Sequence, residues 1–343
     1  MAMKKFINAP ENLTAELLEG MCKAYSNKIA LSDGKIVVRA KPKPQEKVAV
    51  ITLGGAGHEP ALSGFVGEGM LDASVVGDIF AAPNAVAVLG AMRKFKRDAG
   101  ILLVVLNHAG DVMSSNMAMK MAEREGIKFK SVLVAEDISA GLDAPKSDRR
   151  GLAGCIPLIQ VAGAAAEEGK SLDEVFDIAE KFNKRIATLA VAMTGCTHPQ
   201  NGSPISELAD DEMEIGMGQH GEGGGGRSKI LTADETAKIM FQNLAKAVEL
   251  KKGEKAFVMI NGTGASTPME LLIVYRAVSK LAEEMGVELA NGVVDEILTV
   301  QEMAGFQMIL CVLDAQSEKY IFAKSNAPYW TCLGEKQNGR AYT

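Results

Sequence analysis

The chain has 343 residues, of which 47% are hydrophobic and 23% charged, a balance typical of a globular protein with a substantial core. Its formal net charge of −6 disfavours nucleic acid as a partner, because a nucleic-acid-binding surface needs clustered lysine and arginine. Aromatic residues make up only 5%, so stacking platforms for single strands are not expected either. The length favours one large or two medium domains.

The cysteines are scattered and contain no Cys-x-x-Cys pair. They are Cys22, Cys155, Cys196, Cys311 and Cys332. An odd, dispersed set favours reduced thiols and a cytoplasmic protein. The N-terminal MAMKKFINAPENL lacks the apolar core of a signal peptide, and no apolar run reaches about 18 residues, so we expect no membrane partner.

The first 193 residues alternate between strand and helix patterns. Helices are expected at 13–25, 84–97, 115–125 and 155–183, and strands at 47–53, 101–107, 131–136 and 188–193. The run ILLVVLN at 101–107 is almost continuously apolar, as is typical of a strand buried on both faces. The alternation predicts an α/β domain over residues 1–193, with a parallel sheet and helices on both of its faces.

Residues 194–229 differ from the rest, because they are rich in glycine, proline and serine. A structureless loop of this length is uncommon in a compact domain, which indicates a functional segment or a linker. Regular patterns then return. Helices are expected at 232–250 and 268–286, and strands at 255–261, 287–293 and 306–314. We therefore expect a smaller α+β domain over residues 194–343.

Two polar loops follow predicted strands. GGAGHEP at 54–60 follows the strand at 47–53, and NHAGDVMSSN at 107–116 follows the strand at 101–107. Ligands of open parallel sheets bind at the carboxyl ends of the strands, so His58 and Asp111 are expected in one crevice. A histidine and an aspartate placed in this way can share a proton or move one on a substrate.

Other interpretations compete with this one. The GGAG run is also typical of a tight turn. It lacks the G-x-G-x-x-G spacing, because Pro60 stands where the last glycine would be, which disfavours a dinucleotide-binding dehydrogenase. The four histidines lack metal-ligand spacing, so no metal is expected. His220, in GMGQHGEGGGG, belongs either to a loop that closely approaches a ligand or to a flexible surface loop.

Taken together, the motifs carry a resemblance. GGAGHEP at 54–60, NHAGD at 107–111, RRGLAG at 149–154, GCTHP at 195–199, EMEIGMGQHGE at 212–222 and NGTGASTPMEL at 261–271 occur in this order. The chain resembles the dihydroxyacetone-binding subunits of the dihydroxyacetone kinase family, of the phosphotransferase-system-dependent type. The resemblance covers nearly the whole chain, from KKFIN at 4–8 to about residue 330.

The resemblance implies a role for each candidate residue. His220 would form a covalent hemiaminal with the carbonyl of the substrate. His58 would hydrogen-bond the substrate and assist proton transfer, and Asp111 would be the general base for the hydroxyl that receives phosphate. The backbone of Gly55, Ala56 and Gly57 would contact the substrate. The chemistry is sensible, since an imidazole with its ordinary pKa of about 6.5 is a fair nucleophile near neutral pH.

The resemblance also implies partners. The chain has no P-loop, so no cofactor is expected on it. ADP with Mg²⁺ is expected on a separate helical subunit, which a phosphocarrier subunit of the phosphotransferase system recharges. A homodimer is a further expectation.

Four positions depart from the family pattern. Leu106 replaces a usual lysine, Ala56 and Ala82 replace small hydroxyl residues, and Gly223 replaces a proline. Each lost hydrogen-bond donor could weaken recognition by about 0.5–1.5 kcal/mol. Two alternatives therefore stay open beside dihydroxyacetone phosphorylation: a related ketose such as erythrulose as the substrate, or a non-catalytic hydroxyketone sensor that contacts a transcription factor.

Overall fold

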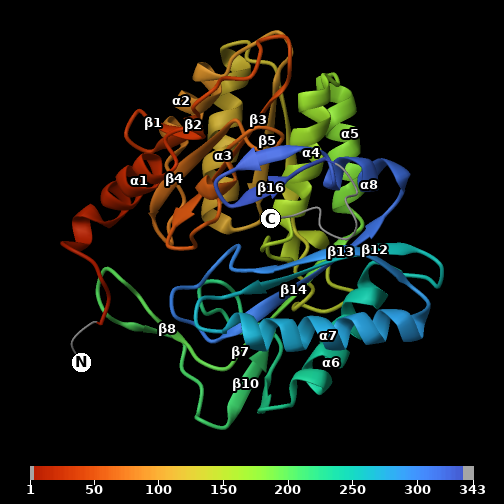
Figure 1. Ribbon diagram of the computed structural model, residues 1–343. Helices are drawn as coiled ribbons and strands as arrows, with labels where there is room; N and C mark the ends of the chain where they lie inside the picture. The colour runs from red at the N-terminus through yellow and green to blue at the C-terminus, as the bar shows by residue number, and fades with distance from the viewer. Residues whose placement is uncertain (1–3, 335–343) are drawn as a thin grey trace. The chain divides into compact units, whose positions relative to one another are not determined.

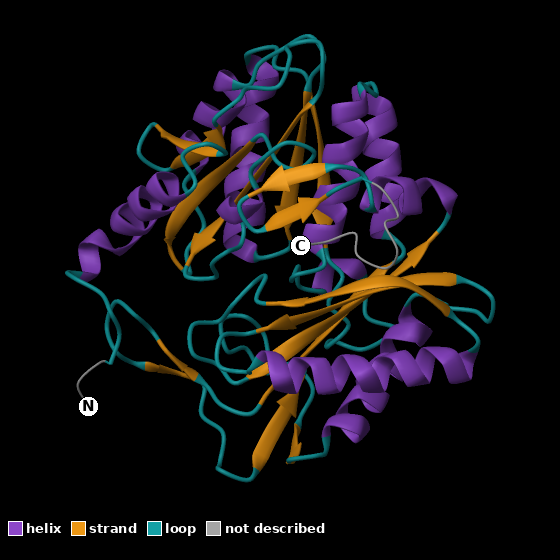
Figure 2. Ribbon diagram, viewed as in Figure 1, coloured by secondary structure: helices purple, strands orange, loops and turns teal. Residues whose placement is uncertain are grey.

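The computed structural model describes residues 4–334. The chain forms two compact units, and each is built from separate stretches of the sequence. The first unit contains residues 5–134, 155–183 and 316–334, and the second contains residues 135–154 and 184–315. Each unit is organised around its own six-stranded sheet, drawn as orange arrows in Figure 2.

The sheet of the first unit has the strand order β1-β2-β4-β3-β5-β6. Its strands are β1 (Ile29–Ser32), β2 (Ile36–Arg39), β3 (Ala49–Ala56), β4 (Ala73–Ile79), β5 (Ile101–Leu106) and β6 (Phe129–Val134). The neighbours from β4 to β6 are parallel, whereas β1 and β2 extend the sheet as antiparallel strands. The carboxyl ends of β3, β4 and β5 therefore meet at one edge.

Helices cover both faces of this sheet (Figure 1). They are α1 (Leu13–Ala24), α2 (Ala85–Lys94), α3 (Ala109–Arg124), α4 (Cys155–Glu168) and α5 (Leu172–Asn183). Alternate residues of the strands, such as Ile51, Leu53 and Leu103, form a core with α2 and α3. The helices α4 and α5 pack on each other and contact β3, β5 and β6. The rest of the unit comprises η1 (Pro10–Asn12), η2 (Ser63–Phe65), α8 (Ala315–Ile321), β15 (Ser325–Ala327) and β16 (Trp330–Cys332).

The sheet of the second unit has the order β11-β10-β7-β14-β12-β13. Its strands are β7 (Ile186–Ala192), β10 (Glu212–Ile215), β11 (Arg227–Lys229), β12 (Lys255–Gly262), β13 (Glu288–Asp295) and β14 (Gly305–Leu313). Only the β12–β13 pair is parallel among these strands. Helices α6 (Ala233–Ala247) and α7 (Pro268–Met285) pack on one face through a common core. The unit also contains η3 (Lys146–Asp148), β8 (Cys196–Thr197) and β9 (Pro204–Ile205).

The predicted fold class is confirmed: an α/β unit carries helices on both faces of a largely parallel sheet, and a second unit is α+β. The division of the chain differs from the predicted boundary after residue 193. The strand expected at 188–193 exists as β7, but it pairs with β10 and β14 of the second sheet. All its residues are buried, so its apolar pattern does not reveal which sheet it joins.

Two expectations about the chain as a whole can be compared with the described residues. None of the five cysteines, all within the described range, forms a disulfide. Across residues 4–334, every helix is too short or too polar to cross a membrane.

The start of α7 offers a test of local stability. Thr267 and Glu270 form a reciprocal capping box, in which the Glu270 carboxylate accepts a hydrogen bond from the Thr267 backbone at 2.8 Å. We predict that Thr267→Ala lowers the free energy of unfolding by about 1 kcal/mol, because the first turn of α7 loses its N-cap hydrogen bond. The hydrogen bond from Thr267 lowers the pKa of Glu270, so the stabilisation is present above the ordinary carboxyl pKa and is lost as pH falls.

The measurement is urea unfolding of the wild-type and Thr267→Ala proteins at about pH 7 and about pH 3. The difference between the two proteins should shrink at the lower pH. Thr267→Ser is the control, since it keeps the hydroxyl and should retain most of the stability. An equal difference at both pH values would contradict the role of the ionised carboxylate.

Candidate functional site

The GGAGHEP segment lies at the carboxyl end of β3 in the first unit. Gly54, Gly55 and Ala56 are the last residues of the strand, three residues beyond its predicted end, and the loop begins at Gly57. The side chain of His58 is buried, with 5% of its surface exposed, and its ring lies against Phe80 with 4.9 Å between ring centroids. Phe80 belongs to the loop 80–84, which follows β4, and its backbone N–H donates to the carbonyl of Ala56 at 2.8 Å. The loops after β3 and β4 are thus joined, and His58 is held between backbone and an aromatic ring.

The glycines of this loop are required by close packing. A Cβ at Gly55 would lie 2.8 Å from the backbone nitrogen of Ala81. A Cβ at Gly57, where φ is +102°, would lie 2.8 Å from the Phe80 ring. Both contacts are too short for any side chain, and the positive φ of Gly57 adds strain for other residues. The glycine run therefore allows the end of β3 to pack closely against the loop after β4. The tight turn and the close approach of backbone, the two interpretations of this run, are both present.

Asp111 lies on a helix, which corrects the expectation of a loop over 107–116. Only Asn107 and His108 connect β5 to α3, and Asp111 occupies the first turn of α3. Connections this short are ordinary in α/β units, and the alternation pattern placed the helix start six residues too late. The Asp111 side chain is buried, and the N-terminus of a helix favours a negative charge there.

The loop 80–84 also lies against the start of α3. A Cβ at Gly110 would lie 3.1 Å from the Cβ of Ala82. The same loop therefore contacts the segment that carries His58 and the segment that carries Asp111. Leu106, the last residue of β5, is buried, so this edge of the sheet presents an apolar side chain where the family pattern has a lysine.

His220 lies in the second unit, in the glycine-rich loop between β10 and β11. The loop closes on itself, because Gly218 N–H donates to the carbonyl of Glu222 at 2.7 Å and Gly221 N–H donates to Gly218 at 3.1 Å. The Glu214 carboxylate accepts from Gly224 N–H at 3.1 Å. The segment around His220 is therefore a hydrogen-bonded closed turn, which favours a loop built to approach a ligand over a flexible surface loop.

The His220 ring is paired with a carboxylate that the sequence analysis did not identify. Its Nδ1 lies 3.1 Å from Oε1 of Glu222, and its backbone N–H donates to Oε2 of Glu222 at 2.9 Å. Partial burial raises the pKa of Glu222, but the hydrogen bonds and charge interaction with His220 outweigh that effect and lower it to about 2. Glu222 is therefore ionised at neutral pH and can only accept hydrogen bonds.

Arg150 connects this loop to the body of the second unit. Its Nε donates to the buried carboxylate of Asp137 at 2.7 Å, and its Nη2 donates to the hydroxyl of Ser139 at 2.7 Å. The guanidinium also donates to two loop carbonyls, those of Gly216 at 2.6 Å and Glu222 at 3.2 Å. The planar guanidinium suits such a site, because it offers several donors in fixed directions.

The RRGLAG segment that carries Arg150 is itself anchored by a buried carboxyl. Oε1 of Glu136 accepts from the backbone of Leu152 and of Gly154, both at 2.9 Å, and from the Thr188 hydroxyl at 3.2 Å. Burial raises the pKa of Glu136 to about 7, although the backbone hydrogen bonds oppose the shift. Glu136 thus holds the segment to β7, next to the Asp137–Arg150 pair.

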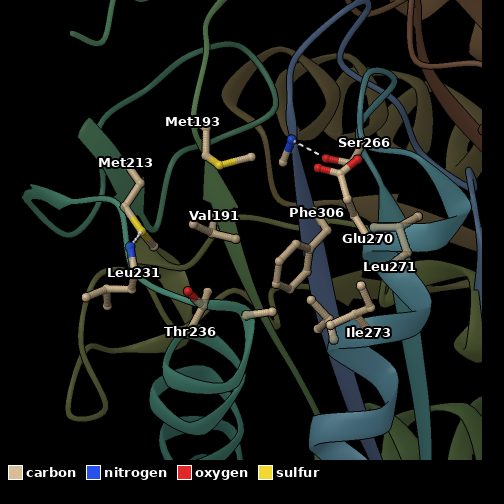
Figure 3. Close-up of a pocket in the computed structure, with 13 residues that line it drawn as sticks. Val191, Met193, Met213, Leu231, Thr236, Ser266, Glu270, Leu271, Ile273 and Phe306 are labelled. Carbon is tan, nitrogen blue, oxygen red and sulfur yellow. Dashed lines mark hydrogen bonds between the residues drawn. The ribbon is translucent and has the colours of Figure 1, made fainter. Parts of the chain in front are cut away.

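A separate cavity of about 200 Å³ lies in the second unit, between its sheet and helices α6 and α7 (Figure 3). Its lining is mostly apolar and includes Val191, Met213 and Phe306. The hydroxyl of Ser266 points toward β14, where it accepts from the Gly305 backbone at 2.9 Å. The lining includes none of the predicted site residues and does not suit a small polyhydroxylated ketone.

The structure thus gives each predicted residue a place. Gly55, Ala56, Gly57, His58 and Asp111 lie at one edge of the first sheet, and His220 lies in a closed loop of the second unit. Sequence reasoning missed Glu222 and Arg150 as site residues. Both lie inside motifs that carry the resemblance, GQHGE and RRGLAG, but their contact joins positions 72 residues apart.

Comparisons with known proteins support the family resemblance that these motifs indicate. The Dak1 domain model matches residues 19–329. The dihydroxyacetone-binding subunit of PTS-dependent dihydroxyacetone kinase 1 from Listeria innocua is 36% identical over 93% of this chain and 96% of its own length. The L-erythrulose kinase of Pectobacterium atrosepticum is 35% identical over 95% of this chain but only 56% of its own length.

A solved structure, the dihydroxyacetone kinase operon co-activator Dha-DhaQ, superposes with a TM-score of 0.87 at 30% identity and covers 92% of this chain and 98% of the co-activator. The resemblance inferred from the motifs is therefore confirmed, and the chain belongs to the Dak1 family, the family of the dihydroxyacetone-binding subunits of dihydroxyacetone kinases.

Proposed function

We propose that this chain is the substrate-binding subunit of a dihydroxyacetone kinase, a phosphotransferase. It captures a short hydroxyketone on His220 and presents it for phosphorylation by a separate subunit. The observation that carries the proposal is the closed glycine loop, in which Arg150 and Glu222 hold a histidine in one orientation. The Listeria relative named as such a subunit matches over nearly the full length of both chains.

Covalent capture suits a very small ligand. A ring nitrogen of His220 adds to the carbonyl carbon, the π electrons of the carbonyl move to its oxygen, that oxygen takes up a proton, and the ring gives up its N–H proton. The product is a hemiaminal, which contains every atom of the ketone because no water leaves. A three-carbon ligand offers little area to bury, so a covalent bond supplies the affinity that contacts alone would not. Glycerol is rejected, since it has no carbonyl.

The first unit supplies the groups for proton transfer. His58 is the proposed hydrogen-bond partner of the substrate, together with the backbone of Gly55, Ala56 and Gly57. Asp111 is the proposed general base that removes the proton from the attacking hydroxyl as phosphate is transferred. Asp111 lies in the first turn of α3, where the positive end of the helix dipole favours a negative charge.

The phosphoryl donor is proposed to lie on another protein. We expect a helical subunit that carries ADP with Mg²⁺, and a phosphocarrier subunit of the phosphotransferase system that recharges it. Under this proposal the chain binds no cofactor of its own, and it acts in the cytoplasm as a homodimer. The Listeria relative is named as one subunit of a PTS-dependent kinase, which supports a divided enzyme.

Two alternatives have specific support. Leu106, Ala56 and Ala82 remove a cation and two hydroxyls from the first-unit edge, which favours a different hydroxyketone such as erythrulose; a relative at 35% identity is an L-erythrulose kinase. The structural similarity to a co-activator favours a hydroxyketone sensor without turnover. The presence of Asp111 favours the kinase over the sensor, because a sensor needs no base at the phosphate-accepting hydroxyl.

The first prediction concerns capture. Incubation with dihydroxyacetone or erythrulose should raise the intact mass of the wild-type protein by the full mass of one ketone. His220→Asn should abolish the shift, because the nucleophile is gone. His198→Asn, which changes another loop histidine of the second unit, is the matched control and should keep the shift. A shift that survives in His220→Asn would contradict the assignment of the nucleophile.

The second prediction separates capture from transfer. Asp111→Asn should keep the mass shift but lower turnover by about 10²- to 10⁴-fold in the presence of the ADP-bearing and phosphocarrier subunits. Asp98→Asn, at an exposed position of the same unit, is the control and should leave turnover unchanged. Normal turnover in Asp111→Asn would rule out its role as base. Adduct formation by the wild type without any turnover would favour the sensor.

A further inference from the structure

The contacts around His220 are asymmetric in a way that bears on its chemistry. Both oxygens of the Glu222 carboxylate face His220, one at its ring nitrogen Nδ1 and the other at its backbone N–H. The two contacts fix the ring relative to its own backbone. A single contact would leave the ring free to turn about its side-chain bonds, so the pair defines which nitrogen faces the carboxylate.

Glu222 is in turn held in place by Arg150. The guanidinium donates to the Glu222 carbonyl, and its Nη1 lies 3.9 Å from Oε2 of the Glu222 carboxylate. Its Nε donates to the carboxylate of Asp137, which is fully buried. Gly218 lies directly between the two groups: a Cβ there would be 2.1 Å from Oε2 of Glu222 and 2.3 Å from Nη1 of Arg150. The carboxylate thus has a fixed position.

An ionised carboxylate cannot donate a hydrogen bond, so the Nδ1 atom that faces Glu222 must carry the hydrogen. The lone pair of the neutral ring then resides on Nε2. Free histidine side chains prefer the opposite tautomer, with the hydrogen on Nε2. We propose that Glu222, held by Arg150, is a positioning residue that fixes His220 in the Nδ1–H tautomer, so that Nε2 is the nitrogen that attacks the ketone.

The reaction step balances with this assignment, which rests on the proposed capture function. The Nε2 lone pair forms the new C–N bond, and the π electrons of the carbonyl become a lone pair on its oxygen. That oxygen takes a proton from a surrounding acid or from water, and the ring gives up its Nδ1 proton, through the Glu222 carboxylate, to the solvent. In total, one proton moves from the ring to the oxygen, and no atom is lost from either reactant.

The test reads the tautomer directly. The ligand-free protein is prepared with ¹⁵N-labelled histidine, and long-range ¹H–¹⁵N correlation spectra are recorded at mildly alkaline pH, where imidazole is neutral. The His220 signals are assigned as those lost in His220→Asn. The proposal expects Nδ1 to carry the hydrogen in the wild type. In Glu222→Gln the preference should fall or reverse, because an amide can also donate to Nδ1.

The same variant should form the ketone adduct more slowly, by up to about 10⁴-fold, the loss that a wrong histidine tautomer causes in a catalytic triad. Glu207→Gln is the matched control, since Glu207 is exposed in the same segment of the second unit and should change neither tautomer nor rate. Arg150→Lys keeps the positive charge but loses the several fixed donors of the guanidinium. It should therefore also lower the population of the Nδ1–H tautomer.

Two outcomes would overturn the proposal: an Nε2–H tautomer in the wild type, or an unchanged Nδ1–H tautomer in Glu222→Gln. The wild-type spectrum alone decides the first, so the proposal stays falsifiable even if a variant fails to fold. Because the spectrum is recorded without ligand, it also separates this proposal from the capture function. A wild type with the Nδ1–H tautomer that forms no adduct would defeat capture and leave the positioning role standing.

Discussion

The guanidinium of Arg150 is the constraint on which the glycine-rich loop depends. It binds the buried carboxylate of Asp137 on one side and two loop carbonyls, those of Gly216 and Glu222, on the other. Burying a charge is costly unless it is paired and hydrogen-bonded, and here Asp137 meets that condition. The glycine at 218 follows from the same constraint, since any Cβ there would collide with the guanidinium.

The two units support functional residues by different means. In the first unit, strands and helices position the candidate residues. His58 follows β3, Asp111 lies in the first turn of α3, and the loop after β4 packs against both segments. In the second unit, a long loop carries His220, and its own hydrogen bonds give it the rigidity that a strand or helix would otherwise supply. The nucleophile proposed here, His220, would have to be held in one geometry, and the loop that carries it closes around Arg150.

The sequence predicts elements better than their assembly. Alternation revealed β3, β5, α2 and α7, whose apolar periods are long and clear. It missed β1, β2 and β4. The strand β7 was assigned to the first sheet, because a fully buried strand has the same pattern in either sheet. Motifs indicated His58, Asp111 and His220 as candidate site residues. The Arg150–Glu222 contact depends on how the chain folds back on itself, which no local pattern records.

A substrate-binding subunit that captures its ligand covalently needs few hydrogen bonds to it. Leu106, Ala56 and Ala82 remove three side-chain donors from the first-unit edge, each of which could contribute about 0.5–1.5 kcal/mol to recognition. The imidazole–carboxylate pair of the second unit is present. Under the proposed function, carbonyl addition would then be retained while discrimination among hydroxyl groups would be relaxed. On this reasoning the carbonyl, more than the length of the carbon chain, defines the substrate class, and hydroxyketones longer than three carbons enter it naturally.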